Sequence, residues 1–239
     1  MKKDQLKIIS FDYGNTVIEF GPDQIRYEHD QLVEALESMF GPCSRARLED
    51  IRNEQIVAPF KRDYVENDTW ECCAELVRWV YNTDPEPQQV DRLVEVRYQS
   101  FMHTAELPAG VKELLLQLKE KYRLALISNY PNGRSIRDSM AKLEIDEVFD
   151  AIVVSGEVGY VKPHALPFET MLKHFDEEPA SCIHIGDNWL ADIQGAMRLG
   201  MQTIYTSQYV PYENIPRNDE DHQPTVCIRH FDDLARLLL

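Results

Sequence analysis

Four polar residues of this sequence occupy the same place relative to apolar segments. Asp12 follows the apolar stretch 6–11, Ser128 ends the stretch 124–128, and Asp187 follows the stretch 182–186. Lys162 lies in the segment after a fourth stretch, 151–155. In open α/β sheets, ligands bind just beyond the carboxyl ends of the strands. An acid there is held by a rigid strand and is still reachable from a crevice, so the four positions predict a polar site.

Each of these residues also has an ordinary structural interpretation. Asp12 could cap a helix or form a turn, Ser128 could cap the next helix, and Asp187 could be a turn residue after Gly186. Lys162 could be a solvated surface lysine. For any one residue alone the structural interpretation is favoured. All four together, in this order along one chain, favour a functional site.

The elements that would position these residues follow a repeating order. Apolar stretches bounded by turn residues predict strands, and apolar residues at helical spacing predict helices. Strands are expected at 6–11, 124–128, 151–155, 182–186, 201–206 and 225–229, and helices at 111–122, 134–143, 167–175, 190–199 and from 231 to the end, with a polar loop at 209–224. Strands that alternate with helices indicate an α/β fold, a doubly wound parallel sheet with a Rossmann-like core.

The segment between the first strand and this repeating pattern is different. From residue 23 to about 103, apolar residues recur only at helical spacing, with prolines at 42, 59, 85 and 87 between the helices. We interpret residues 20–103 as an inserted all-helical domain, and residues 1–19 and 104–239 as the α/β core.

The composition excludes several classes of protein. The 239 residues carry a formal net charge of −16, which argues against binding to nucleic acid or to anionic membranes. Five cysteines, an odd number without a zinc-site spacing, are expected to be reduced thiols. No apolar stretch is long enough for a membrane helix, and the N-terminus lacks the features of a signal peptide. We therefore expect a cytoplasmic protein.

The four positions lie in short motifs that resemble those of a known family. The motifs are Phe11-Asp12-Tyr13-Gly14-Asn15-Thr16, Ile127-Ser128-Asn129, Gly159-Tyr160-Val161-Lys162-Pro163 and Gly186-Asp187-Asn188-Trp189-Leu190-Ala191-Asp192. With them, the chain resembles the haloacid dehalogenase-like (HAD) hydrolase superfamily over nearly its whole length. The helical insertion matches the family's cap domain.

The resemblance implies a role for each matching residue. Asp12 would be the nucleophile that forms an aspartyl-phosphate, with Ser128 and Lys162 as the other catalytic residues. Ser128, Lys162 and the backbone amide of Asn129 would bind the phosphoryl group. Mg²⁺ would be held by Asp12, by the backbone carbonyl of Gly14 and by Asp187, with Asp192 supporting the metal directly or through water.

One position departs from the family's phosphatases. Most of them carry a second Asp two residues after the nucleophile, which acts as general acid and base, whereas this chain has Gly14. A glycine carbonyl can bind metal but cannot transfer a proton, and a missing acid/base costs about 10²–10⁴ in rate. Glu19, Arg26, Tyr64 and His103 are conceivable replacements, although a solvated or packing role suits each of them better.

Three functions are compatible with these motifs. The first is an Mg²⁺-dependent phosphatase for a small phosphorylated metabolite. The second is a dehalogenase of short haloacids, which needs no metal and so leaves Asp187 and Asp192 unexplained. The third is a binding protein that keeps the fold without catalysis, for which Gly14 is the sole support. The sequence does not identify the substrate or the oligomeric state.

Overall fold

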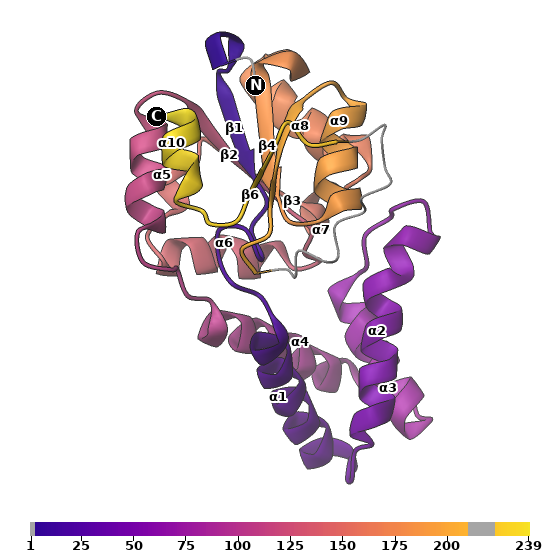
Figure 1. Cartoon of the computed structure of the whole chain (residues 1–239). Helices are drawn as coiled ribbons and strands as arrows, with labels where there is room; N and C mark the ends of the chain where they lie inside the picture. The colour runs from indigo at the N-terminus through magenta and orange to yellow at the C-terminus, as the bar shows by residue number, and fades with distance from the viewer. Residues whose placement is uncertain (1–2, 210–222) are drawn as a thin grey trace.

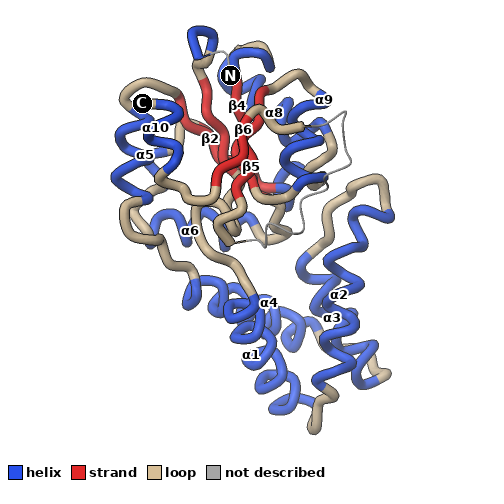
Figure 2. Tube along the Cα trace, viewed as in Figure 1, coloured by secondary structure: helices blue, strands red, loops and turns tan. Residues whose placement is uncertain are grey.

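A computed structural model describes residues 3–209 and 223–239, and within these residues the strands form one parallel sheet (Figures 1 and 2). Its six strands lie in the order β3-β2-β1-β4-β5-β6. They are β1 Ile8–Phe11, β2 Arg123–Ser128, β3 Ala151–Val154, β4 Cys182–Gly186, β5 Gln202–Thr206 and β6 Val226–Ile228. β1 lies between β2 and β4, and this places its C-terminal end at the middle of the sheet. The α/β fold predicted from the sequence is confirmed.

Helices cover both faces of the sheet, as a doubly wound fold requires (Figure 1). On one face lie α5 (Val111–Lys119), α6 (Gly133–Lys142) and α10 (Asp233–Leu238), which share a core with β1. On the other face lie α8 (Ala165–Phe175) and α9 (Gly195–Arg198). The central strands are buried on both faces. This explains why their sequences are continuous apolar stretches rather than alternations of apolar and polar residues.

The insertion is helical, as the apolar spacing predicts. It contains α1 (Pro22–Phe40), α2 (Arg45–Lys61), α3 (Thr69–Tyr81) and α4 (Pro87–Thr104), and among its described residues no strand is present. These helices share a core of their own, and α4 also packs against α6 of the sheet domain. Pro87 is the first residue of α4, where a missing N–H costs nothing. Pro59 lies inside α2, so its predicted position between helices was wrong.

Several boundaries near the site differ from those expected. The helix expected at 190–199 begins as a π-helix, Trp189–Gln194, and continues as α9. A short helix that the sequence did not indicate, α7 (Ser155–Val158), follows β3. Most of the polar loop expected at 209–224 lies outside the described residues. All five cysteines are free, as expected.

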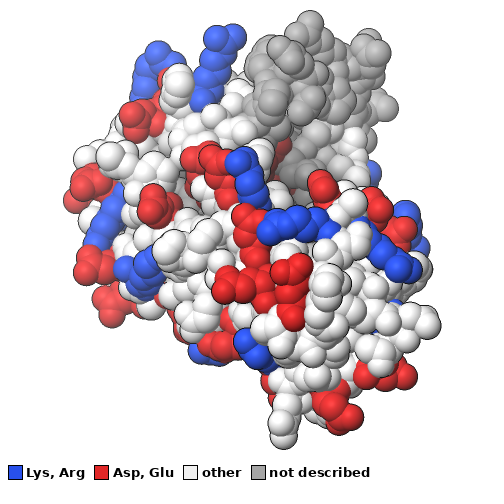
Figure 3. Space-filling model, turned by 90° about the horizontal axis from the view of Figure 1, so that it is seen from below, with Lys and Arg blue, Asp and Glu red and all other residues white. Residues whose placement is uncertain are grey.

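The described surface agrees with the acidic composition. On the face shown in Figure 3, Lys and Arg side chains are interspersed with Asp and Glu rather than gathered into one basic area. None of the helices in residues 3–209 and 223–239 has the length and apolar character that crossing a membrane requires.

Candidate active site

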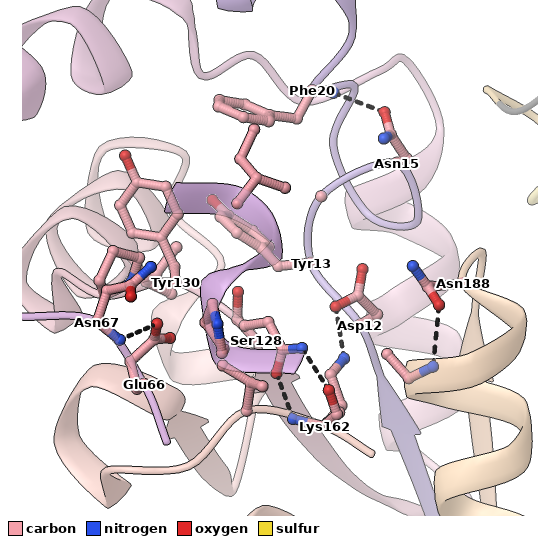
Figure 4. A pocket seen from close by; sticks show the side chains of 18 of the residues that line it. Asp12, Tyr13, Asn15, Phe20, Glu66, Asn67, Ser128, Tyr130, Lys162 and Asn188 are labelled. Atoms are coloured by element: carbon pink, nitrogen blue, oxygen red, sulfur yellow. Dashed lines mark hydrogen bonds and ion pairs between the residues drawn. The ribbon is translucent and has the colours of Figure 1, made fainter. Parts of the chain in front are cut away.

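The residues predicted to form a site come together in one cavity. Asp12, Gly14, Ser128, Asn129, Lys162, Asp187 and Asp192 all line it. The cavity has a volume of about 410 Å³ and lies at the carboxyl ends of β1, β2 and β4, with residues of α1, α2 and α4 on its other side. Figure 4 shows Asp12, Ser128 and Lys162 converging on this space. A volume of this size suits a small ligand.

Lys162 is the centre of the polar contacts. Its side chain is 1% exposed, and its ammonium group donates to Asp12 Oδ1 at 2.6 Å, to Asp192 Oδ1 at 2.7 Å and to the carbonyl oxygen of Ile127 at 2.7 Å. Burial alone would lower the pKa of Lys162, but the two carboxylates raise it above its ordinary value. The lysine therefore stays charged and fixes one oxygen of Asp12, so that the direction of the other oxygen is also set.

Asn129 positions the lysine through its side chain. Its Nδ2 donates to the carbonyl oxygen of Lys162 at 3.0 Å, and its Oδ1 accepts from the Lys162 backbone N–H at 2.7 Å. This two-way contact joins the loop after β2 to the segment that carries the lysine. From the sequence we expected the backbone amide of Asn129 to bind the substrate. The contact of its side chain with the Lys162 backbone was not predicted.

Three carboxylates face one another beside the lysine. Oxygen atoms of Asp12, Asp187 and Asp192 all lie within 4.8 Å of one another. Burial, followed by the charges of Asp12 and Asp192, raises the pKa of Asp187 to about 8. Burial also raises the pKa of Asp12 to about 6, against the opposing effect of Lys162. Three neighbouring carboxylates with one lysine leave negative charge that a divalent cation would neutralise.

Asp192 is held by a buried chain of hydrogen bonds that the sequence analysis missed. Its Oδ1 accepts from His184 Nε2 at 3.2 Å, and its Oδ2 accepts from the Asn188 backbone N–H at 2.9 Å. The other ring nitrogen, His184 Nδ1, lies 2.9 Å from the Ser10 hydroxyl on the neighbouring strand. Burial lowers the pKa of His184, so the neutral ring donates to Asp192 and accepts from Ser10.

Gly186 allows this close approach, because a Cβ atom there would lie 2.3 Å from Asp192 Cγ and Oδ2. We expect Gly186→Ala to displace Asp192 or to bend β4, with a loss of about 1–3 kcal/mol in the free energy of unfolding. Chemical denaturation of both proteins measures the loss. Gly200→Ala is unsuitable as a control because of its positive φ, but Gly21→Ala, whose Cβ would have its closest contact at 3.6 Å, is suitable. Equal stability of the Gly186→Ala protein and the wild type would contradict the packing argument.

The four conceivable replacements for the missing acid/base do not line the cavity among its described residues. Glu19 is exposed, and Arg26 pairs with Asp23 on the surface. His103 is exposed and stacks on Tyr27, with ring centroids 4.6 Å apart. Tyr64 packs edge-on against Phe60 and accepts from the Val161 backbone N–H through its carbonyl oxygen. Their packing and surface roles agree with the interpretation favoured by the sequence.

Other charged residues line the cavity and were not singled out from the sequence. Glu28 of α1, Arg52 of α2 and Arg97 of α4 enter it from the insertion. Glu66, from the loop between α2 and α3, lines the same cavity as Ser128 (Figure 4). Both oxygens of Glu66 accept hydrogen bonds, Oε1 from the Asn67 backbone N–H at 2.7 Å and Oε2 from the Ser155 hydroxyl.

Known proteins similar to this chain include phosphatases. A glyceraldehyde 3-phosphate phosphatase from Pyrococcus furiosus is 34% identical over 107 residues, which cover 44% of this chain and 43% of that protein. The chain thus aligns with less than half the length of this relative. A phosphoglycolate phosphatase from Haemophilus influenzae is 26% identical over 98% of this chain and 97% of its own.

The fold is shared with solved structures. A 2-haloacid dehalogenase from Pseudomonas syringae superposes with a TM-score of 0.75 over 98% of both chains, at 19% identity, which supports the fold alone. The family model described as haloacid dehalogenase-like hydrolase matches residues 32–206, well over half of the sequence. This match, together with the cavity that gathers all four motifs, shows that the chain belongs to the haloacid dehalogenase-like hydrolase family.

Proposed function

We propose that the protein is an Mg²⁺-dependent phosphatase that hydrolyses a small phosphorylated metabolite through an aspartyl-phosphate on Asp12. The observation that carries this proposal is the placement of Asp12 at the end of β1, bonded to Lys162 and within 4.8 Å of two further carboxylates. The names of the two relatives, both phosphatases, support the same class of reaction. A cytoplasmic location stays a prediction.

The reaction has two steps on Asp12. In the first, a carboxylate oxygen attacks phosphorus, the bond from phosphorus to the substrate oxygen breaks, and the alcohol leaves after taking up a proton. In the second, water attacks the aspartyl-phosphate, inorganic phosphate leaves, and the carboxylate is regenerated. Asp12 stands at the end of a buried strand, and Lys162 fixes its Oδ1, so the nucleophile is oriented before the substrate arrives.

Lys162, Ser128 and the backbone amide of Asn129 would bind the phosphoryl group. The ammonium of Lys162 offsets negative charge that accumulates on the transferring group and on Asp12. The Ser128 side chain, buried at the end of β2, faces the same cavity and can donate to a phosphoryl oxygen. The side chain of Asn129 keeps the lysine in place, so substitution of Asn129 would act on charge stabilisation as well as on binding.

The residues present fit a magnesium ion. Mg²⁺ prefers oxygen ligands and keeps several waters, and Asp12, Asp187 and the carbonyl of Gly14 supply a set of this kind. Asp192 is bound to Lys162, His184 and the Asn188 amide, so it orients the site more than it ligates a metal. When bound, the ion would neutralise charge on the phosphoryl oxygens. The dehalogenase alternative gives no use to Asp187, because release of halide from carbon needs no cation.

A colorimetric assay with p-nitrophenyl phosphate tests the proposal, because this leaving group needs little acid catalysis. We expect hydrolysis with Mg²⁺, loss of hydrolysis with a chelator, and recovery when Mg²⁺ is returned. Asp187→Asn should remove the metal-dependent rate, since Asp187 is the carboxylate that Lys162 does not hold. Hydrolysis by the wild type that does not respond to Mg²⁺ would contradict the assignment of the metal.

Melting temperature provides a second readout for the same metal site. The unfolded chain loses the Asp187 proton near the ordinary pKa of 3.8, whereas the folded, metal-free protein keeps it up to about pH 8. Without metal, stability should therefore fall as the pH rises between these values. Mg²⁺ must displace this proton, so the rise in melting temperature on adding Mg²⁺ should be larger at pH 8.5 than at pH 6. An equal rise at both pH values, or none at millimolar Mg²⁺, would contradict the site.

A further inference from the structure

Three charged side chains of the insertion meet in the cavity. Glu28 of α1 is bracketed by two arginines, with Arg97 Nε 3.1 Å from its Oε1 and Arg52 Nη2 3.5 Å from its Oε2. The Glu28 side chain is 4% exposed, and those of Arg52 and Arg97 are 15% and 17% exposed. We call these residues the Glu28 cluster. All of them line the cavity that contains the catalytic motifs.

The Glu28 cluster carries one more positive charge than negative. A buried charge without a partner is costly, whereas a paired charge is much less so. Glu66, the other acid that the insertion contributes to the cavity, has both oxygens engaged by Asn67 and Ser155. Within the described residues, no ion pair joins Glu66 to either arginine. The excess positive charge therefore remains available to a ligand.

The cluster is also incompletely satisfied as a salt bridge. Glu28 Oε1 is buried and accepts no hydrogen bond from a described residue, although Arg97 lies close to it. Arg52 donates to the carbonyl oxygen of Ile25 at 3.1 Å. These contacts use only part of the N–H donors of the two guanidinium groups. A planar carboxylate matches the geometry of the donors that are left.

Tyr130 connects the Glu28 cluster to the phosphoryl site. It follows Ser128 by two residues, and the charges of Glu28, Arg97 and Arg52 all act on its phenol. Its ring packs against Phe101, with centroids 4.8 Å apart, and it lines the same cavity (Figure 4). Ser128, Arg52 and Arg97 line this same cavity, so one bound molecule has groups of both kinds around it.

We propose that Arg52 and Arg97 bind a carboxylate of the substrate, so that the protein acts on small phosphorylated carboxylic acids. This inference rests on the proposed phosphatase function. The single excess positive charge of the cluster balances the charge of one carboxylate. A second phosphate group on the substrate would carry two negative charges, more than the cluster can balance. The inference separates the substrates named for the two relatives, because phosphoglycolate carries a carboxylate and glyceraldehyde 3-phosphate does not.

The test compares 2-phosphoglycolate with p-nitrophenyl phosphate, which has no carboxylate. Arg97→Gln and Arg52→Gln should each lower kcat/KM for 2-phosphoglycolate by about 10- to 100-fold, the value of one charge-assisted hydrogen bond. Most of the change should appear in KM, and the change with p-nitrophenyl phosphate should be much smaller. Arg92→Gln is the matched control, because Arg92 lies on the same helix as Arg97 and is exposed.

The outcomes separate the two proposals. If the wild type hydrolyses neither substrate with Mg²⁺, the phosphatase function itself is wrong. If it hydrolyses p-nitrophenyl phosphate and the ratio of the two kcat/KM values is unchanged in both variants, the Glu28 cluster is a structural salt bridge and the carboxylate inference is wrong. Melting temperatures of the variants show whether a parallel loss with both substrates comes from misfolding. The carboxylate inference would also be overturned if the wild type cleaved glyceraldehyde 3-phosphate more efficiently than 2-phosphoglycolate.

Discussion

Asp12→Asn is expected to reduce turnover by about 10⁴-fold or more and to leave the fold intact. The amide has nearly the shape of the carboxylate but is a poor nucleophile, so no aspartyl-phosphate can form. Asp12 is placed by the end of β1, and its backbone N–H donates to the Ile185 carbonyl oxygen at 2.8 Å, a contact that the substitution does not touch.

The folded state should tolerate this substitution because Asp12 is not a stabilising charge. Burial raises its pKa to about 6, which means that the fold disfavours the ionised form relative to the unfolded chain. An uncharged amide avoids that cost. Lys162 keeps its contacts with Asp192 and the Ile127 carbonyl oxygen, so it is not left unpaired. We therefore expect a melting temperature close to that of the wild type at neutral pH.

Turnover of p-nitrophenyl phosphate and thermal melting measure the two halves of this prediction. Asp4→Asn is a matched control, because Asp4 is an exposed acid in a short helix before β1. Mass spectrometry after an acid quench should also find phosphate on Asp12 in the wild type and none in the variant. An Asp12→Asn protein with wild-type activity would exclude the covalent mechanism, and one that does not fold would show that Asp12 is structural.

The strands near the site could be predicted from the sequence because their apolar composition agrees with their burial in the sheet. β4 was predicted with its observed bounds, since a fully buried central strand is a short apolar stretch between turns. The motif residues follow such strands, and parallel strands end at one edge, so their meeting in one cavity could be anticipated. The π-helix after Asn188 could not be predicted from the sequence, because its hydrogen-bond pattern depends on how Asp192 packs against Gly186.

The sequence contains a signal for the Glu28 cluster that the sequence analysis did not use. Glu28 lies four residues before Leu32 on the apolar face of α1, and Arg97 lies between Leu93 and Phe101 on the apolar face of α4. A charged residue at a core position of an amphipathic helix indicates a buried charge. The spacing does not show that charges on separate helices meet, because that depends on the crossing of the helices. His184 was missed for the same reason, since its partner lies on another element.

Gly14→Asp is expected to increase the hydrolysis of alkyl phosphates selectively, by up to about 10²–10⁴-fold. A phenol leaves without a proton, whereas an alkoxide needs one in the transition state. The wild type should therefore cleave aryl and acyl phosphates much faster than simple alkyl phosphates. The variant should reduce this difference, because the new carboxylate can donate the proton and later activate water.

The backbone at Gly14 accepts a Cβ atom. Gly14 does not have a positive φ, and a Cβ atom there would lie 3.4 Å from Phe20 Cβ, an ordinary van der Waals contact. Backbone strain therefore does not oppose the substitution. Gly14→Asn is the matched control, because it has the same size and cannot exchange a proton near neutral pH.

The measurement is kcat/KM for a series of phosphates of similar size whose leaving groups differ in pKa. Equal values across the series for the wild type, with chemistry shown to be rate-limiting, would mean that another residue already supplies the proton. Glu19 and His103 are exposed and do not line the cavity, so they would be poor candidates. Glu66 would then be the first to test, since it lines the cavity and burial raises its pKa above the ordinary value (Figure 4). Glu66→Gln should in that case restore a steep dependence on the leaving group, and Gly14→Asp should compensate for it.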